Sequence, residues 1–396
     1  MKPTQNVVLT KGLVLLLATA VGLIAANLYY AQPVTAMISH ALGLAPQAAG
    51  LVVTMTQIGY GLGVLLIVPL GDIAENRKLV MTMMAVAVLG LLGLAFVTEL
   101  IPYFMAAFIT GLGASTVQII MPYAAHFASE EKRGAVVGQL TSGLMLGIML
   151  SRPISSLLTD LFSWHAVFIL SAMLMTLLAF ALYNFLPEKP PINLNLRYKK
   201  LVSSMFQLFI DTPIVRRRGI YQAFLFGSFC LFWTAVPLLL ASPQFHLSQT
   251  AIAIFALVGV AGAVSAPFAG KAADRGWTQP ATIVAMLASC FSFLLSHFFQ
   301  AGSPEGLAAL IISAILLDAG ITANLILGQR AIFSLNAEYR SRLNGLYIAT
   351  IFVGGATGSA LGAWAYASGG WALASLVGFA MPATALAYFL TESKKI

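Results

Sequence analysis

Charged residues are scarce in this sequence. Only 9% of its 396 residues are Asp, Glu, Lys or Arg, whereas 59% are apolar. A soluble domain needs charge on roughly a quarter of its residues to cover its surface. This composition excludes a water-soluble globular protein, so we expect the chain to fold in a lipid bilayer.

Groups that support catalysis or metal binding are also scarce. The two cysteines, Cys230 and Cys290, lie in separate apolar runs without the spacing of a disulfide framework or a zinc site. The five histidines are scattered, and there is no HExxH, CxxC or phosphate-binding glycine loop. We expect no enzymatic activity, no cofactor and no metal.

Apolar runs long enough to span a bilayer recur along the whole chain. A spanning helix needs about 20 residues, and these runs lack the alternating polarity of barrel strands. The sequence therefore predicts an all-α integral membrane protein with twelve transmembrane helices. The predicted spans cover 12–38, 48–70, 79–97, 102–127, 135–159, 164–186, 217–240, 249–269, 279–299, 306–333, 345–367 and 371–391.

The cationic residues predict how the chain is oriented. All but two of the 21 Lys and Arg residues fall in the even-numbered loops, the long middle segment and the two termini; the exceptions are Arg152 and Arg330. Loops rich in Lys and Arg remain cytoplasmic. We therefore expect a multi-pass protein of the inner (plasma) membrane with both termini in the cytoplasm. The net charge of +8 follows this topology and does not indicate binding to nucleic acid.

The chain divides into two similar halves. A polar, proline-containing linker over 187–216 separates an N-terminal six-helix half, 1–186, from a C-terminal six-helix half, 217–396. Within the linker, 201–210 is apolar enough to form a short interfacial helix. Two parallel repeats of six helices place a substrate site between them, around a central cavity. Five residues recur at an offset of 207: Gly113, Glu131, Arg133, Gly138 and Trp164 reappear as Gly320, Glu338, Arg340, Gly345 and Trp371.

A loop after the second span carries a family resemblance. The run Gly71-Asp72-Ile73-Ala74-Glu75-Asn76-Arg77-Lys78 is similar to the signature of the major facilitator superfamily, and Ala-Ala-Asp-Arg-Gly at 272–276 echoes it. The resemblance covers essentially the whole chain. It implies the twelve-helix major facilitator fold and a cytoplasmic gate, although an acidic side chain in such a loop can also be simply solvated. The gate motif comprises Gly71, Asp72, Arg77, Lys78, Arg133, Asp274 and Arg275.

Span five indicates a branch of that superfamily. Gly143-x-x-x-Gly147 resembles the glycine-rich motif of drug and sugar efflux antiporters, but Arg152 and Pro153 stand where that motif has small residues. Ala107 also replaces the buried arginine of proton-coupled drug antiporters. The resemblance favours proton-coupled efflux by antiport of a small hydrophobic or amphipathic molecule. The alternative is proton symport that imports a small organic anion attracted by Arg152. We expect the partners to be this substrate, protons and the bilayer, and the protein to be a monomer.

Ionisable side chains inside a span are costly and usually functional. Asp318 lies about 16 Å into span ten at 1.5 Å per residue, near mid-membrane, so it is the candidate for proton coupling. Burial there favours its protonated form, whereas a nearby cation such as Arg152 favours the charged form. The alternative for Asp318 is a permanent pair with a neighbour, and for Arg152 a structural brace to Asp160 or to a backbone carbonyl.

Polar and aromatic residues on spans one, four, seven and ten are candidates to line the cavity, because the resemblance places those spans around it. On span seven, four residues recur at i, i+4, i+7 and i+11, which predicts one helical stripe, although such a stripe can equally face lipid or a neighbouring helix. Buried amides need partners, supplied by a ligand or by another helix. The candidates are Asn27, Tyr30, Gln118, Tyr123, Arg152, Gln222, Phe226, Phe229, Trp233 and Asn324.

Overall fold

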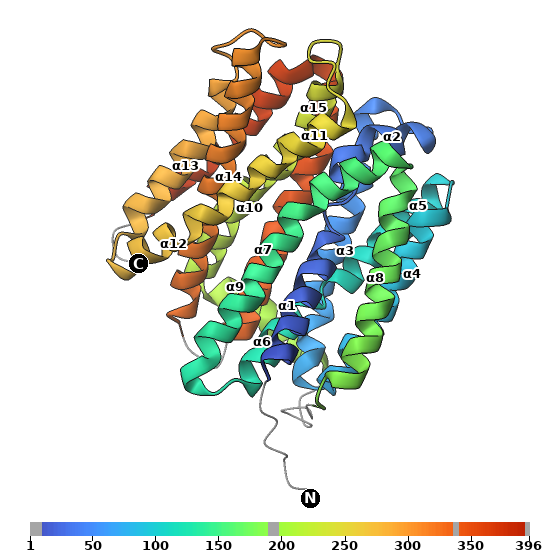
Figure 1. Ribbon diagram of the computed structural model, residues 1–396. Coiled ribbons are helices and arrows are strands. Elements are labelled where there is room, and N and C mark those ends of the chain that lie inside the picture. The colour runs from blue at the N-terminus through green and yellow to red at the C-terminus, as the bar shows by residue number, and fades with distance from the viewer. Residues whose placement is uncertain (1–9, 189–197, 336–339, 393–396) are drawn as a thin grey trace, which may run out of the picture.

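The computed structural model describes residues 10–188, 198–335 and 340–392, and every regular element in these ranges is a helix. Figure 1 shows the long helices as one bundle, with the chain entering at its lower end. Before the polar middle segment come α1 (Lys11–Ala26), η1 (Gln32–Val34), α2 (Thr35–Ala41), η2 (Pro46–Ala48), α3 (Leu51–Leu66), η3 (Val68–Asp72), α4 (Asn76–Phe96), α5 (Leu100–Ala114), α6 (Val117–Phe127), α7 (Glu130–Leu161) and α8 (Trp164–Phe185). After it come α9 (Tyr198–Asp211), α10 (Pro213–Ala241), α11 (Gln249–Ala256), η4 (Leu257–Val260), α12 (Ala261–Asp274), α13 (Thr278–Leu295), α14 (Pro304–Phe333) and α15 (Arg340–Leu390).

The predicted twelve-helix membrane architecture is confirmed. Ten segments of the described chain are long and apolar enough to cross a membrane, and α1 is a shorter apolar helix. The 51-residue α15 is two helices joined at Gly369 and Gly370, where Gly370 has a φ of 61° that only glycine adopts readily. Counting α1 and dividing α15 gives the twelve spans.

Several spans that the sequence predicted as continuous are interrupted; η4 separates α11 from α12 in span eight. Span one leaves the α conformation after Ala26, passes through the 3₁₀ helix η1, where Pro33 cannot donate a backbone hydrogen bond, and becomes α-helical again at α2. Span four breaks between α5 and α6, where the hydroxyls of Ser115 and Thr116 donate to the carbonyls of Leu112 and Gly113. Such local side-chain bonds compete with the helical ladder.

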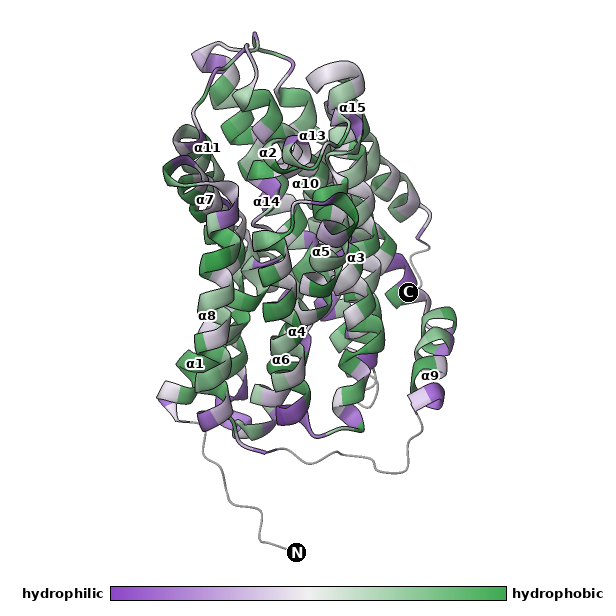
Figure 2. Ribbon diagram, turned by 90° about the vertical axis from the view of Figure 1, so that its right-hand side faces the viewer, coloured by the Kyte–Doolittle hydropathy of each residue, from purple (hydrophilic) through white to green (hydrophobic). Residues whose placement is uncertain are grey.

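The outside of the bundle is apolar. Leu15, Phe96, Ile101 and Phe180 are each more than half exposed. Figure 2 shows hydrophobic residues along the helices and hydrophilic ones gathered toward their ends. An exposed apolar belt of this kind suits contact with lipid.

Glycines bring pairs of helices into close contact in both parts of the chain. A Cβ at Gly143 or Gly147 of α7 would overlap the backbone of α1, where Gly22 lies. In the same way, a Cβ at Gly354 or Gly358 of α15 would overlap the backbone of α10. Small residues four apart allow such close packing in membranes. The glycine-rich motif of span five therefore has a packing role, which is repeated later in the chain.

The two parts of the chain meet at the end of the bundle away from the N-terminus. There the Thr54 hydroxyl of α3 donates to the Ala356 carbonyl of α15 over 3.0 Å, and Thr250 of α11 donates to Asp160 of α7. These contacts close that end, so a central cavity can open only toward the other.

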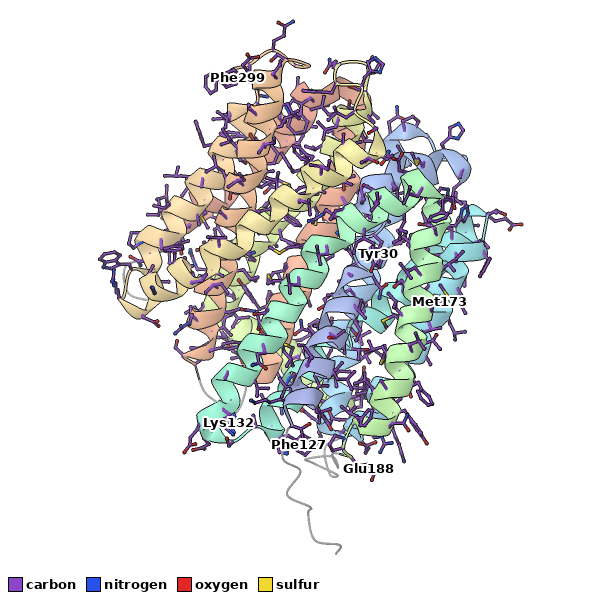
Figure 3. The ribbon with its side chains drawn as sticks, viewed as in Figure 1. Tyr30, Phe127, Lys132, Met173, Glu188 and Phe299 are labelled. Carbon is purple, nitrogen blue, oxygen red and sulfur yellow. The ribbon has the colours of Figure 1, made fainter. Side chains whose placement is uncertain are left out.

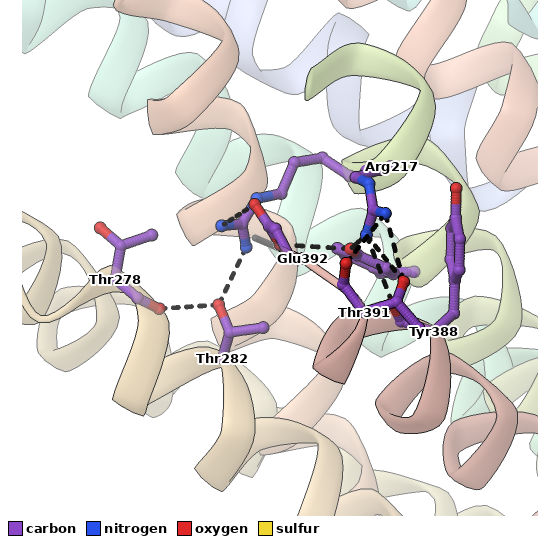
Figure 4. Close-up of polar contacts among 8 residues, drawn as sticks. Arg217, Thr278, Thr282, Tyr388, Thr391 and Glu392 are labelled. Atoms are coloured by element: carbon purple, nitrogen blue, oxygen red, sulfur yellow. Dashed lines mark hydrogen bonds and ion pairs between the residues drawn. The ribbon is translucent and has the colours of Figure 1, made fainter. Parts of the chain in front are cut away.

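Thr391 and Glu392, which directly follow α15, are held by a polar cluster on α10 and α13, shown in Figure 4. Glu392 forms a buried ion pair with Arg218 at 3.9 Å, and Arg218 also donates to Thr282 over 3.0 Å. Arg217 donates to the Thr391 hydroxyl over 3.2 Å. The cluster holds the ends of α10, α13 and α15 together.

Candidate functional site

A cavity of about 730 Å³ lies between the two parts of the bundle. It is lined by spans one, two, four, five, seven, eight, ten and eleven. It extends from Arg152 and Asp318 to Arg133, near the start of α7, and to Phe333, at the end of α14. Lys132, next to Arg133, marks the same end of the bundle as the N-terminus in Figure 3, whereas Phe299 lies at the opposite end. The cavity thus reaches the N-terminal end of the bundle and is closed at the other.

Six of the candidate site residues line this cavity and carry its polar and aromatic character. Three of the four residues in the stripe expected on span seven therefore face the cavity, and Trp233 does not. The six residues are Gln118, Arg152, Gln222, Phe226, Phe229 and Asp318.

Five other candidates lie outside the lining, in the walls. Asn27 accepts a hydrogen bond from Ser171 of α8, and the Tyr123 hydroxyl donates to the Pro187 carbonyl over 2.6 Å. The Asn27 amide and the Tyr123 hydroxyl therefore both have hydrogen-bond partners within the protein, as buried polar groups require. Tyr30, Trp233 and Asn324 are likewise buried in the walls.

Asn324 and Trp233 still act on the lining residues. Asn324 donates to the Gln222 side chain over 2.7 Å, and Gln222 donates to the Ile321 carbonyl over 3.2 Å. The indole N–H of Trp233 donates to Asp318 over 3.0 Å. These two wall residues orient the amide and the carboxylate that line the cavity.

Arg152 is held at the closed end by an amide and by aromatic rings. Its Nε donates to the side-chain oxygen of Gln32 over 2.8 Å. Its guanidinium carbon lies 4.5 Å from the ring centre of Trp233, 4.9 Å from that of Phe229 and 5.2 Å from that of Tyr29. The brace to Asp160 considered from the sequence is not the arrangement found, because Asp160 accepts from Thr250.

Asp318 faces Arg152 across a gap that Gly259 leaves open. A Cβ on Gly259 would lie 3.0 Å from the second carboxylate oxygen of Asp318 and 3.6 Å from Nη1 of Arg152. The two side chains are not in direct ion-pair contact among the described pairs, since none within 4.0 Å joins them. The cation and the carboxylate therefore border the same gap without forming a direct ion pair.

Several lining residues were missed from the sequence. Tyr29, Tyr60 and Phe352 add aromatic faces. Span five contributes more than spans one or four, and a signal for this was available. Thr141, Leu144, Met145, Ile148, Met149 and Arg152 recur at helical spacing and all line the cavity.

Two residues of the expected gate motif, Arg77 and Arg133, make contacts near the start of α4 and of α7. Arg77 donates to the Tyr183 carbonyl and lies 3.8 Å from Glu188. Arg133 donates to the Ala125 carbonyl over 3.1 Å. Each of these contacts stays within the first part of the chain.

Gly71 and Lys78 of the motif make contacts within the motif itself. Asp72 ends η3, and Gly71 offers its carbonyl to the Asn76 side chain over 2.9 Å. The backbone N–H of Lys78 donates to Glu75.

The echo of the motif makes a contact that the sequence did not predict. Asp274 pairs with Arg330 of span ten at 2.7 Å, while Arg275 lies over the ring of Trp277 at 5.6 Å.

Comparison with known proteins identifies the family. The model of the Major Facilitator Superfamily matches residues 15–304 and 220–396. The chain belongs to this superfamily. It is a secondary transporter of the major facilitator type and not an enzyme.

Relatives of this transporter extend over nearly its whole length. It is 38% identical to "Uncharacterized transporter YgaY" of Escherichia coli O157:H7 over 378 residues, which cover 95% of this chain and 94% of that one. It is 29% identical to "Probable transporter SCO4007" of Streptomyces coelicolor, over 90% of this chain and 82% of that one.

Solved structures share the fold of this transporter. The nucleoside transporter NupG has a TM-score of 0.72 at 14% identity, over 95% of this chain and 97% of that chain. A POT family transporter in complex with 5-aminolevulinic acid has a TM-score of 0.72 at 14% identity, over 95% and 94%.

Proposed function

We propose that this transporter couples the movement of an amphipathic organic anion to that of a proton, by symport, with Asp318 as the proton acceptor. The observation that carries the proposal is the facing pair of Arg152 and Asp318 at the closed end of the cavity. Both side chains are nearly fully buried, so the net charge of this site decides which of its states can be enclosed.

The charges of the site favour symport. Arg152 and Asp318 together are neutral when the site is empty. They are neutral again when a monoanion binds at Arg152 and a proton binds to Asp318. A site with the anion alone or the proton alone carries a net charge, and enclosing a net charge away from water is unfavourable. The empty and the doubly loaded transporter can therefore change between inward- and outward-facing states, which is the requirement for symport.

Export by antiport, the mode favoured by the sequence, is the second candidate. The apolar cavity wall and the carboxylate of Asp318 beside aromatic rings would suit a cationic amphiphile. An antiporter must not change state when empty, however, and here the empty site is the neutral one. The charge argument thus favours the anion, whose import would follow an inward proton gradient.

The cavity wall supports an amphipathic substrate. Apart from the charged closed end, the described lining is largely aliphatic and aromatic, with residues such as Phe226, Phe229 and Phe352. An apolar wall with a few placed polar groups is typical of sites for small organic ligands.

The remaining expectations on topology belong to the same proposal. We place the transporter in the inner membrane, with both termini and the 187–216 linker in the cytoplasm and six spans on each side of the linker. Residues 189–197 of this linker, like the two termini, lie outside the described residues; α9 lies in its described part. Relatives include the "Inner membrane transport protein YnfM" of Escherichia coli K12, at 24% identity. We also propose that it acts as a monomer, with the motif of Asp72 and Arg77 as a cytoplasmic gate.

Proteoliposomes test the coupling mode. Reconstituted transporter is given an imposed pH gradient, acidic outside, and a panel of labelled organic acids and organic amines. Symport predicts that acids accumulate inside and that a protonophore abolishes the accumulation. Antiport predicts instead that loaded amines are exchanged for protons, and that result would replace the proposal.

A further inference from the structure

Two buried hydrogen-bond donors lie at the closed end of the cavity, on the two side chains that Arg152 Nε and the Gln32 oxygen join. They are Nη2 of Arg152 and Nε2 of Gln32, and within the described parts of the chain neither has a hydrogen-bond partner. The exposed fraction of the side chain is 2% for Arg152 and 0% for Gln32. Buried polar groups are rarely left unpaired, so a pair of them needs an explanation.

The orientation of the Gln32 amide is fixed by Arg152. A guanidinium nitrogen can only donate, so the amide must turn its oxygen toward Nε, as it does at 2.8 Å. The amide nitrogen then has no alternative to acting as a donor elsewhere. No rotation of the amide can satisfy both groups at once.

The geometry of arginine places the free Nη2 on the same edge as Nε. This edge is the fork that binds planar carboxylates through two parallel hydrogen bonds. Gln32 occupies only the Nε half of the fork. Two donors remain unpaired, Nη2 of Arg152 and the amide nitrogen of Gln32. Both belong to the immediate surroundings of the positive charge of Arg152.

We propose that Gln32 and Arg152 together hold the carboxylate head of the substrate, and that Gln32 is a specificity-determining residue. The inference rests on the proposed function, since it names the chemical class of the anion. One N–H donor on the Arg152 cation and one on the neutral Gln32 amide match the two oxygens of a carboxylate. An ammonium head, which only donates, would leave both donors unpaired and add a second positive charge beside Arg152.

The rings beside Arg152 define where the rest of the substrate lies. Tyr29 and Phe229 contact the guanidinium and also line the cavity, whereas Gln32 does not line it. The head therefore enters past these rings to reach the amide, and an apolar body stays in the cavity. The substrate class is a monocarboxylate with an aromatic or aliphatic tail.

Matched ligands that differ only in their head groups test this assignment. Purified transporter is mixed with phenylacetate, phenylacetamide or phenethylamine, and with hexanoate, hexanamide or hexylamine. Binding is measured by the rise in melting temperature and by quenching of tryptophan fluorescence, because Trp233 lies against Arg152. We expect the two carboxylates to bind and the amides and amines to bind at least about tenfold more weakly, the scale of one charge-assisted hydrogen bond.

Two variants separate a role in binding from a role in folding. Gln32→Leu removes the amide donor, and carboxylate binding should weaken about tenfold or more. Gln32→Glu supplies a carboxylate inside the protein that can take both halves of the Arg152 fork. It should abolish the response to carboxylates. A purely structural Gln32 would change stability but leave the preference for carboxylates over amides intact.

The outcomes distinguish this inference from the proposed function. If neither carboxylate binds the wild type at millimolar concentration, or if Gln32→Glu still responds to them, the head-group assignment is overturned. If Gln32→Leu keeps the wild-type preference among head groups, the donors are satisfied by water and the inference fails, while proton-driven uptake of an acid would still support symport. If amines alone bind and exchange for protons, symport itself is overturned.

Discussion

Trp233 donates its indole N–H to one carboxylate oxygen of Asp318 over 3.0 Å, and the second oxygen of Asp318 faces Gly259. One oxygen is therefore fixed by the protein, and the other points to the gap that Arg152 borders. A carboxylate held on one side only can take a proton on the other without breaking its hydrogen bond. This arrangement suits a group that binds and releases a proton during transport.

Asp318→Asn should separate exchange from net transport. The amide resembles the protonated acid, so the anion-loaded site stays neutral and can still change state. The empty site then carries the charge of Arg152 alone and should not return. We expect exchange of labelled for unlabelled substrate in proteoliposomes to persist, while uptake driven by a pH gradient is lost.

The control for this experiment is Asp211→Asn, which removes one negative charge at the exposed end of α9. It should leave both activities at the wild-type level. Gradient-driven uptake by Asp318→Asn at the wild-type rate would remove Asp318 from the mechanism.

Arg152 and Asp318 should depend on each other for stability. Arg152→Gln alone leaves a buried carboxylate without a facing cation, which we expect to cost about 3 kcal/mol. Adding Asp318→Asn removes that charge as well, so the double variant should melt at a higher temperature than Arg152→Gln alone. Additive effects of the two substitutions in this double-mutant cycle would mean that the charges do not compensate each other.

The topology can be tested with single cysteines at opposite ends of the bundle. The native Cys230 and Cys290 are buried, which keeps the background reaction low. Glu188, whose side chain is 78% exposed, lies toward the N-terminal end, and Phe299 lies at the other. In intact cells, an impermeant thiol reagent should label Phe299→Cys and not Glu188→Cys. The reverse pattern would place the termini outside the cytoplasm.

The sequence predicts the spans well because polar backbone groups cannot be left exposed to lipid. Each spanning segment must therefore be a helix, and each such helix appears in the sequence as a long apolar run. It also marked Asp318, since an acid in such a run stands out. The breaks in spans one and four were missed because serine, threonine and proline occur in continuous membrane helices as well. The bond between Gln32 and Arg152 joins residues 120 apart in sequence. Helical periodicity shows which residues share a face, but it does not show which neighbouring helix that face meets.

Asp72→Asn should slow transport while leaving the fold and the affinity for substrate unchanged. A carboxylate at the gate motif acts on the balance between inward- and outward-facing states and not on the cavity. The described contacts of Arg77 and Arg133 stay within the first part of the chain, as expected when the cavity reaches this end. Initial uptake rates and binding constants, measured in parallel, check this. Wild-type uptake at normal expression would contradict a gate role for Asp72.

Gly259 should be intolerant of even one added methyl group. In Gly259→Ala the new Cβ would lie 3.0 Å from Asp318, 3.4 Å from Trp233 and 3.6 Å from Arg152, inside the gap between cation and carboxylate. A shift of the order of 1 Å in reacting or binding groups can lower rates steeply, so we expect uptake to fall at least about tenfold.

Gly270→Ala is the matched control. Gly270 lies in α12 of the same span, and its Cβ would make only an ordinary contact, 3.8 Å from Arg330. Both variants add the same atoms to span eight, so a shared effect on folding would lower their melting temperatures alike. Loss of uptake in Gly259→Ala with normal uptake in Gly270→Ala would show that the gap between Arg152 and Asp318 must stay open for transport, whereas equal uptake by both would mean that the gap is not used.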